Sequence, residues 1–281
     1  MKKKYIVGII VILIIIVDLF VLLYPSVSDY INAMNQSRVV TDYYDNIGTI
    51  PEEDLSKYLN AAREYNLSLL TNAARFSPTP EETAEYNSQL NSGAGVMGVL
   101  TIGRLEINLP IYHGTDAGVL QIGLGHLQGS SLPVGGIGTH SIVTGHSGLP
   151  SSKLLTDLQK MKQGDTFVIN CMKQTITYRV DQIKTVEPHE VEQLGIDVNE
   201  DYCTLVTCTP YGINTHRLLV RGKRIDNAVA AAGVKWDYHS DARALSRVQV
   251  ILLFLAPLTP VLIIFIIIKC RRIHQGGKTN D

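Results

Sequence analysis

The sequence predicts a mainly β domain, an antiparallel barrel or sandwich, flanked by two membrane-spanning helices. Two observations predict this fold class. From about residue 96 to residue 225, short β-type runs alternate with glycines and polar turns. Apolar residues, which make up 45% of the 281-residue chain, gather instead at its two ends. The runs there, of about 20 residues each, are long enough to cross a bilayer as helices.

The first apolar run covers residues 5–24 and follows three lysines, and the second covers residues 248–268 and precedes a basic tail, residues 269–281. Positive charge favours the cytoplasmic side of a membrane. We therefore expect a two-pass cell-membrane protein with anchors at 1–24 and 248–268, both termini in the cytoplasm and the intervening domain outside the cell. A cleaved signal peptide, with a small-residue site at Ser26-Val27-Ser28, is the alternative for the N-terminus.

Residues 25–94 form a helical and lid-like segment. An acidic start at residues 51–54 precedes apolar side chains at three- and four-residue spacing, which predicts an amphipathic helix: Leu55, Tyr58, Leu59, Ala62, Tyr65 and Leu69. The prolines of residues 76–80 break any helix, and the polar run up to residue 93 predicts a mobile linker. A second linker, 227–247, leads to the C-terminal anchor.

The barrel is expected within residues 95–226. Two short helical patches interrupt it, at Ala117–Ile122 and Lys153–Met161. The predicted strands are Gly98–Ile102, Arg104–Ile111, Ser141–Thr144, Thr166–Asn170, Thr175–Ile183, Tyr202–Thr207 and His216–Arg221.

Composition and charge exclude some functions. The formal net charge is −1, and basic residues cluster only beside the apolar runs, so we expect no nucleic-acid partner. Three of the four cysteines fall in the extracellular part, which leaves at least one free thiol in an oxidising compartment. His113, His126 and His140 lack metal-ligand spacing, and we expect neither a metal nor a cofactor.

Three residues at the ends of β-type runs carry the candidate chemistry. Alternation along a strand places Cys208 on the face of Thr204 and opposite Cys203. A hairpin through residues 210–214 brings Arg217 near Cys208, while His146 follows Gly145 at the end of another run. Taken singly, each residue type usually has a structural role. Together they supply a nucleophile, a proton carrier and a fixed cation, which acyl transfer through a thioester requires.

The motifs around these residues are long and specific. Thr204-Leu205-Val206-Thr207-Cys208 matches the Thr-Leu-x-Thr-Cys signature of sortases, and the stretch from about residue 95 to 225 resembles that family. The pilin-polymerising class C branch is the most similar, on the evidence of Leu109-Pro110-Ile111-Tyr112-His113-Gly114-Thr115, Gly125-His126-Leu127, His146-Ser147-Gly148-Leu149-Pro150 and Cys208-Thr209-Pro210-Tyr211-Gly212.

The resemblance implies a closed antiparallel β-barrel of about eight strands and a substrate with a Leu-Pro-x-Thr-Gly-like sorting signal. Cys208 is then the nucleophile, His146 the general acid and base, and Arg217 the group that holds the oxyanion. Thr207 and His126 are candidates to line the substrate groove. The acyl group is expected to pass to a lysine of a second pilin subunit.

The sequence departs from class C in two places. Ser147 follows the candidate histidine where arginine is common. The usual Asp-Pro-aromatic lid is missing, and Arg75-Phe76-Ser77-Pro78 is the nearest counterpart. Either Phe76 occupies the groove as a lid, or the chain has no lid.

Three other functions compete with pilin polymerisation. A wall-anchoring sortase uses a cell-wall amine as acceptor, and a cysteine endopeptidase uses water. A β-rich surface or pilus subunit needs its own Leu-Pro-x-Thr-Gly signal before the second apolar run, and residues 241–246 are Asp-Ala-Arg-Ala-Leu-Ser instead.

Overall fold

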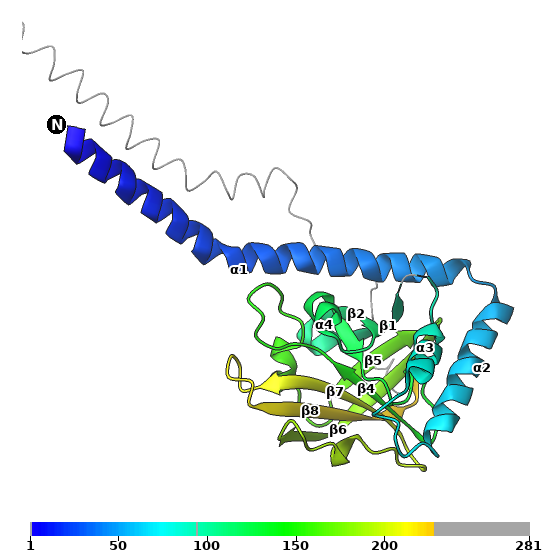
Figure 1. Ribbon diagram of the computed structural model, residues 1–281. Helices are drawn as coiled ribbons and strands as arrows, with labels where there is room; N and C mark the ends of the chain where they lie inside the picture. The colour runs from blue at the N-terminus through cyan, green and yellow to red at the C-terminus, as the bar shows by residue number, and fades with distance from the viewer. Residues whose placement is uncertain (1, 94, 228–281) are drawn as a thin grey trace, which may run out of the picture. The chain divides into compact units, whose positions relative to one another are not determined.

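The computed structural model describes residues 2–93 and 95–227 (Figure 1). The first helix, α1 (Lys2–Thr49), is a single element of 48 residues with Pro25 inside it. The sequence predicts an anchor that ends at residue 24, but the helix continues well beyond it. Among the described residues, those from Asp29 onward belong to the compact unit that contains the barrel.

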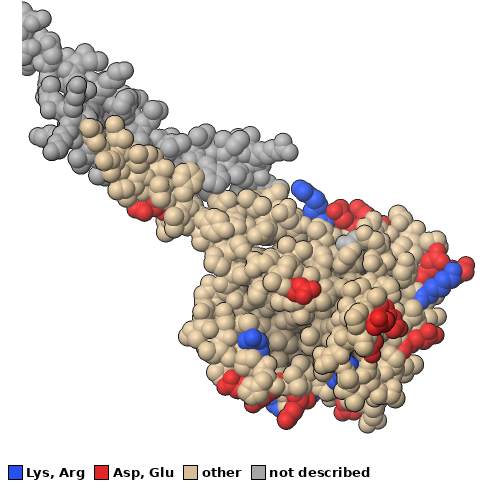
Figure 2. Space-filling view, in the orientation of Figure 1, with Lys and Arg blue, Asp and Glu red and all other residues tan. Residues whose placement is uncertain are grey.

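The apolar part of α1 is the candidate membrane span among the described residues. It lies within Gly8–Thr49 and has a mean hydropathy of 2.8. Its large aliphatic side chains are exposed, and the described surface of this part is almost free of charged groups (Figure 2). The first predicted anchor is thus a helix long and apolar enough to span a membrane. The second apolar run, 248–268, lies outside the described residues.

Two helices connect α1 to the barrel. In α2 (Glu52–Leu69), five of the six predicted stripe residues are buried, and Tyr58 packs against the same core partly exposed. α3 (Pro80–Ser88) falls where the sequence analysis predicts a mobile linker, so that prediction is wrong. Proline is tolerated in the first turn of a helix. A capping box closes that turn, since Thr79 Oγ1 accepts from Glu82 N (3.2 Å) and Glu82 Oε2 accepts from Thr79 N (2.7 Å).

Eight strands close the barrel, in agreement with the predicted number. Their order around it is β1-β2-β3-β4-β7-β8-β6-β5. The strands are β1 (Val96–Ile102), β2 (Ile107–His113), β3 (Leu124–His126), β4 (Thr139–Thr144), β5 (Thr166–Cys171), β6 (Gln174–Val186), β7 (Asp201–Thr209) and β8 (His216–Ile225).

The barrel is not fully antiparallel, which corrects the expected topology. β2 pairs with β3 in parallel, across a connection that holds α4 (Ala117–Ile122), and β4 pairs with β7 in parallel. A parallel pair needs a long crossover, and the chain between β4 and β7 supplies it with β5 and β6. The carboxyl ends of β4 and β7 therefore lie at the same edge of the barrel (Figure 1).

Side chains pack on both faces of the barrel wall. The interior holds the main core, which includes the stacked rings of Phe167 and Tyr178, 5.4 Å apart. We call the smaller group on the opposite face of β4, β7 and β8 the outer-face cluster: Ile142, Val186, Leu194 and Leu219, with Leu127 and Val206 against them. The β6–β7 loop, residues 187–200, contributes Leu194 and so covers part of this outer face.

Candidate active site

Cys208 lies near the end of β7 on the outer face and is half-buried, whereas Cys203 points into the interior and is fully buried. Strand alternation predicts that Cys208 and Cys203 lie on opposite faces of the strand, and the structure shows this arrangement. Burial raises the pKa of the Cys203 thiol well above its ordinary value. Cys171 is also free and buried; its thiol donates to Met97 O at 3.1 Å.

Arg217 is directly opposite Cys208 in the antiparallel pairing of β7 with β8. The turn between the strands is closed by bonds from Ile213 N (3.1 Å) and Asn214 N (2.9 Å) to Pro210 O. One guanidinium nitrogen of Arg217, Nη1, donates to Asn214 O at 3.2 Å and to His216 O at 3.1 Å. The turn therefore fixes the arginine at the start of β8, beside the cysteine.

His146 reaches the same edge through the parallel pairing of β4 with β7. The last pair of that register joins Thr144 to Val206, and Gly145 N donates to Val206 O at 3.1 Å. His146 and Cys208 each lie two residues beyond this pair. Three strand ends thus bring together a half-buried histidine, cysteine and arginine.

The loop after His146 folds back on itself. Leu155 N donates to His146 O at 3.1 Å, and Gly148 N donates to Thr156 Oγ1 at 3.0 Å. A Cβ at Gly145 would lie 2.5 Å from Leu124 Cδ2, so any larger residue here would require the buried Leu124 side chain to shift. The predicted helical patch at Lys153–Met161 is shorter than expected, a 3₁₀ helix over Thr156–Lys160.

The two candidate groove residues do not line an open groove. Thr207 is buried on the interior side of β7, where its Oγ1 donates to Gly145 O at 2.7 Å and ties β7 to the histidine loop. His126 is fully buried, with Nδ1 3.0 Å from Tyr86 Oη and Nε2 2.8 Å from Ser131 O. Burial lowers the pKa of His126 to about 4. α3, which the sequence analysis missed, supplies the covering tyrosine.

The candidate lid residue, Phe76, lies beside the β3–β4 loop and is 40% exposed. A Cβ at Gly129 would approach its ring to 2.9 Å. Arg75 lies over the Phe76 ring, 4.6 Å from the centroid, and its Nη2 donates to Leu194 O at 3.3 Å. The segment thus contacts the two loops that border the outer-face cluster.

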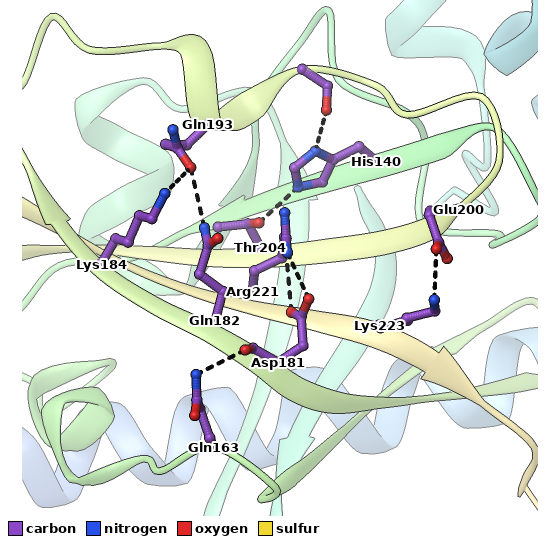
Figure 3. Close-up of polar contacts among 11 residues, drawn as sticks. His140, Gln163, Asp181, Gln182, Lys184, Gln193, Glu200, Thr204, Arg221 and Lys223 are labelled. Atoms are coloured by element: carbon purple, nitrogen blue, oxygen red, sulfur yellow. Dashed lines mark hydrogen bonds and ion pairs between the residues drawn. The ribbon is translucent and has the colours of Figure 1, made fainter.

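A polar network on the outer face holds the β6–β7 loop, and sequence reasoning missed it (Figure 3). His140 bridges Gly195 O and Thr204 Oγ1, at 2.7 Å from each. Gln193 Oε1 accepts from Gln182 (3.2 Å) and Lys184 (2.7 Å) on β6. Burial lowers the pKa of His140 to about 4. The loop is therefore fixed to β4, β6 and β7 by polar as well as apolar contacts.

Comparisons with known proteins agree on one family. The sortase domain model matches residues 100–225. Sortase C1 from Streptococcus agalactiae is similar at 50% identity and a TM-score of 0.66, over 68% of this chain and 99% of that one. Clostridium perfringens sortase C, solved with the C-terminal cell wall sorting motif, is 40% identical with a TM-score of 0.59, over 66% of this chain and 97% of that one.

A curated relative, sortase A of Streptococcus agalactiae serotype III, is 27% identical over 166 residues, which are 58% of this chain. The match spans 64% of that relative's length. The chain thus spans less than two thirds of the curated relatives that it matches.

Proposed function

Because the chain belongs to the sortase family, we propose that it is a membrane-held cysteine transpeptidase. Its substrate is an extracellular protein with a Leu-Pro-x-Thr-Gly-like sorting signal, which it cleaves between Thr and Gly. One observation carries this proposal: Cys208 is paired across the hairpin with Arg217, and the parallel β4–β7 pair brings His146 to the same edge.

In the first half-reaction, Cys208 Sγ attacks the Thr carbonyl carbon and the Arg217 guanidinium stabilises the oxyanion that forms. The carbon–nitrogen bond to Gly breaks, and His146 gives the departing amine its proton. The Thr acyl group is then held on Cys208 as a thioester. In the second half-reaction, an amine attacks the thioester and passes a proton to His146, and Cys208 leaves as the thiolate.

The acceptor we favour is a lysine of a pilin subunit, so the product is a covalent polymer. The similarity to sortase C1 of Streptococcus agalactiae supports this choice over a cell-wall amine or water. A pilin precursor held by its own apolar tail meets a membrane-held enzyme in two dimensions, which raises the effective concentration for repeated transfer. Residues 95–226 form the catalytic domain outside the membrane, in a two-pass protein whose second span is 248–268.

The test is to co-express the full-length protein with its candidate pilin and to separate the boiled detergent extract by size. We expect a ladder of covalent polymers that is lost with Cys208→Ala and with removal of the acceptor lysine. A single wall-linked product that is independent of every pilin lysine would favour anchoring. Free cleaved pilin, unchanged by added amine, would favour an endopeptidase.

Phe76 is the candidate lid of this site. Its segment contacts both the β3–β4 and β6–β7 loops, through Gly129 and Leu194 O. If it guards the groove, Phe76→Ala speeds labelling of Cys208 by a small maleimide, whereas substitution of the exposed Leu67 on α2 does not. Equal labelling rates in the Phe76 variant and the unaltered protein would mean that this segment is no lid.

A further inference from the structure

Three polar side chains of α1 bind the loop that follows His146. Asp29 Oδ1 accepts from Lys153 N at 2.6 Å, and Asn32 Nδ2 donates to Ser151 O at 2.7 Å. Gln36 Nε2 lies 3.2 Å from Ser152 Oγ and 3.1 Å from Ile122 O. Three consecutive residues of the loop, 151–153, are therefore each held by this one helix.

The spacing of the three side chains explains how one helix reaches them all. Residues three and four apart lie on the same face of a helix, and the three residues follow that spacing. Gln36 is 7% exposed and Ser152 is 2% exposed. A buried polar group that loses its partner is costly, so this contact holds the loop in one place.

The loop also has contacts of its own. Its base is closed by the bonds from Leu155 N to His146 O and from Gly148 N to Thr156 Oγ1. Between these bonds, the loop makes one isolated bridge, Leu149 with Ser152, and one backbone bond, from Thr156 N to Lys153 O at 2.9 Å. Leu154 is buried in the main core, and Leu149 packs against that core. The contacts with α1 fall between these two leucines, at residues 151–153, and hold the polar part of the loop from outside.

α1 itself does not depend on these contacts to stay against the barrel. Farther along the helix, Tyr43 is fully buried, with its hydroxyl donating to Met97 O (3.3 Å) and accepting from Met172 N (3.0 Å). Lys173 Nζ also donates to Ile50 O at 3.1 Å just beyond the helix. Loss of the loop contacts therefore leaves the helix docked, and their effect is local to the histidine loop.

We propose that Asp29, Asn32 and Gln36 are positioning residues that hold His146 in place for proton transfer. This inference rests on the proposed function, in which His146 protonates the leaving amine. The same helix continues without interruption into the candidate membrane span. The anchor of this enzyme thus also supports its catalytic histidine, and a soluble form that starts after residue 36 lacks that support.

The test uses the full-length protein in lipid nanodiscs, with all three residues changed to alanine. The matched control changes three exposed polar residues of the same helix, Thr41→Ala, Asp42→Ala and Asn46→Ala. Hydrogen exchange of residues 147–156 and steady-state kinetics with a Leu-Pro-x-Thr-Gly peptide are measured on both. We expect at least about 10-fold faster exchange and an about 10- to 100-fold lower kcat in the first variant only, because small misplacements of a catalytic group are this costly.

KM should change little, because Cys208, Arg217 and the outer-face cluster are unaltered, and restoring Gln36 alone should recover part of kcat. The inference would be overturned if hydrogen exchange of residues 147–156 were unchanged in the triple alanine variant. It would also be overturned if exchange were faster but kcat were normal, or if only KM rose. The exchange measurement needs no turnover. Failure of the proposed function, seen as full activity in Cys208→Ala, is therefore distinguishable from failure of this inference.

Discussion

The two faces of β7 give the same residue type opposite properties. Cys203 points into the core, has no exposed surface and has a pKa far above its ordinary value. Cys208 lies five positions later on the other face, half-buried at the open edge and opposite Arg217. A reactive thiolate needs access and a nearby positive charge. The face of the strand, rather than the residue type, therefore decides which cysteine is suited to be a nucleophile.

The sharpest test of this comparison is to remove each thiol in turn. We expect Cys208→Ala to abolish the acyl-enzyme completely, because no other exposed thiol lies among the described residues. Cys203→Ala should still form it, with a loss of about 1 kcal/mol in stability, typical of a core substitution. Intact-mass spectrometry after mixing with a sorting-signal peptide measures both. An acyl-enzyme on Cys208→Ala, or none on a folded Cys203→Ala, would reverse the assignment.

The second test compares two arginines that share the outer face of β8. Arg217→Ala should lower kcat/KM by about 10²–10³, the usual cost of losing an oxyanion donor. Arg221 lies over the Tyr202 ring at 4.2 Å and binds Asp181 at 2.6 Å, so Arg221→Ala should affect stability and leave kcat/KM within a few-fold. Similar losses of kcat/KM in both variants would mean that the face as a whole, and not Arg217, supports turnover.

The third test concerns the two buried histidines, whose pKa values are lowered to about 4. In the unfolded chain a histidine has a pKa of about 6.5. As the pH falls from about 6.5 to 4, the two histidines become protonated in the unfolded state but stay neutral in the folded state. The free energy of unfolding therefore decreases. One pKa unit corresponds to about 1.4 kcal/mol, which gives at most about 3.5 kcal/mol per histidine.

Urea unfolding of the full-length protein in detergent, at pH 7 and at pH 4.5, measures this loss. Replacing His126 and His140 by glutamine should flatten the dependence on pH. A slope that is the same with and without the two histidines would show that other groups cause the acid sensitivity.

The smallest expected effect is a change in the free energy of unfolding on substitution of Thr207, on the interior side of β7. Thr207→Val keeps the shape but removes the bond to Gly145 O, and one such bond contributes about 1 kcal/mol. Urea unfolding should show this decrease. If stability is unchanged, the tie between β7 and the histidine loop contributes nothing measurable.

Local patterns in the sequence predict the site better than they predict the sheet. Strand alternation and a short turn are enough to place Cys208 opposite Arg217, because both depend only on neighbours in the chain. The parallel pairing of β4 with β7 depends on contacts between segments that are distant in the sequence. The series of β-type segments along the chain does not indicate which of them pair in parallel. The expectation of an antiparallel barrel was wrong for that reason.

Two other corrections have different causes. The capping box of Thr79 and Glu82 is a local signal for the start of α3. This helix was not predicted, because the two nearby prolines were treated as helix breakers. Tyr86 of that helix covers His126, with its hydroxyl 3.0 Å from Nδ1, so the burial of this histidine could not be predicted without α3. The contacts of α1 with residues 151–153 have no local signal, because they join segments more than 100 positions apart.

The order of strands around the barrel also decides when the site comes into existence. β7 and β8 are the last described strands to leave the ribosome, yet they lie between β4 and β6 and complete the ring. Domains are made from the N-terminus onward and fold as units, so the histidine loop is synthesised long before the closing hairpin. That hairpin carries both Cys208 and Arg217. Until that hairpin closes the ring, the histidine loop lacks both the thiol and the guanidinium, so the three candidate groups come together only when the barrel is complete.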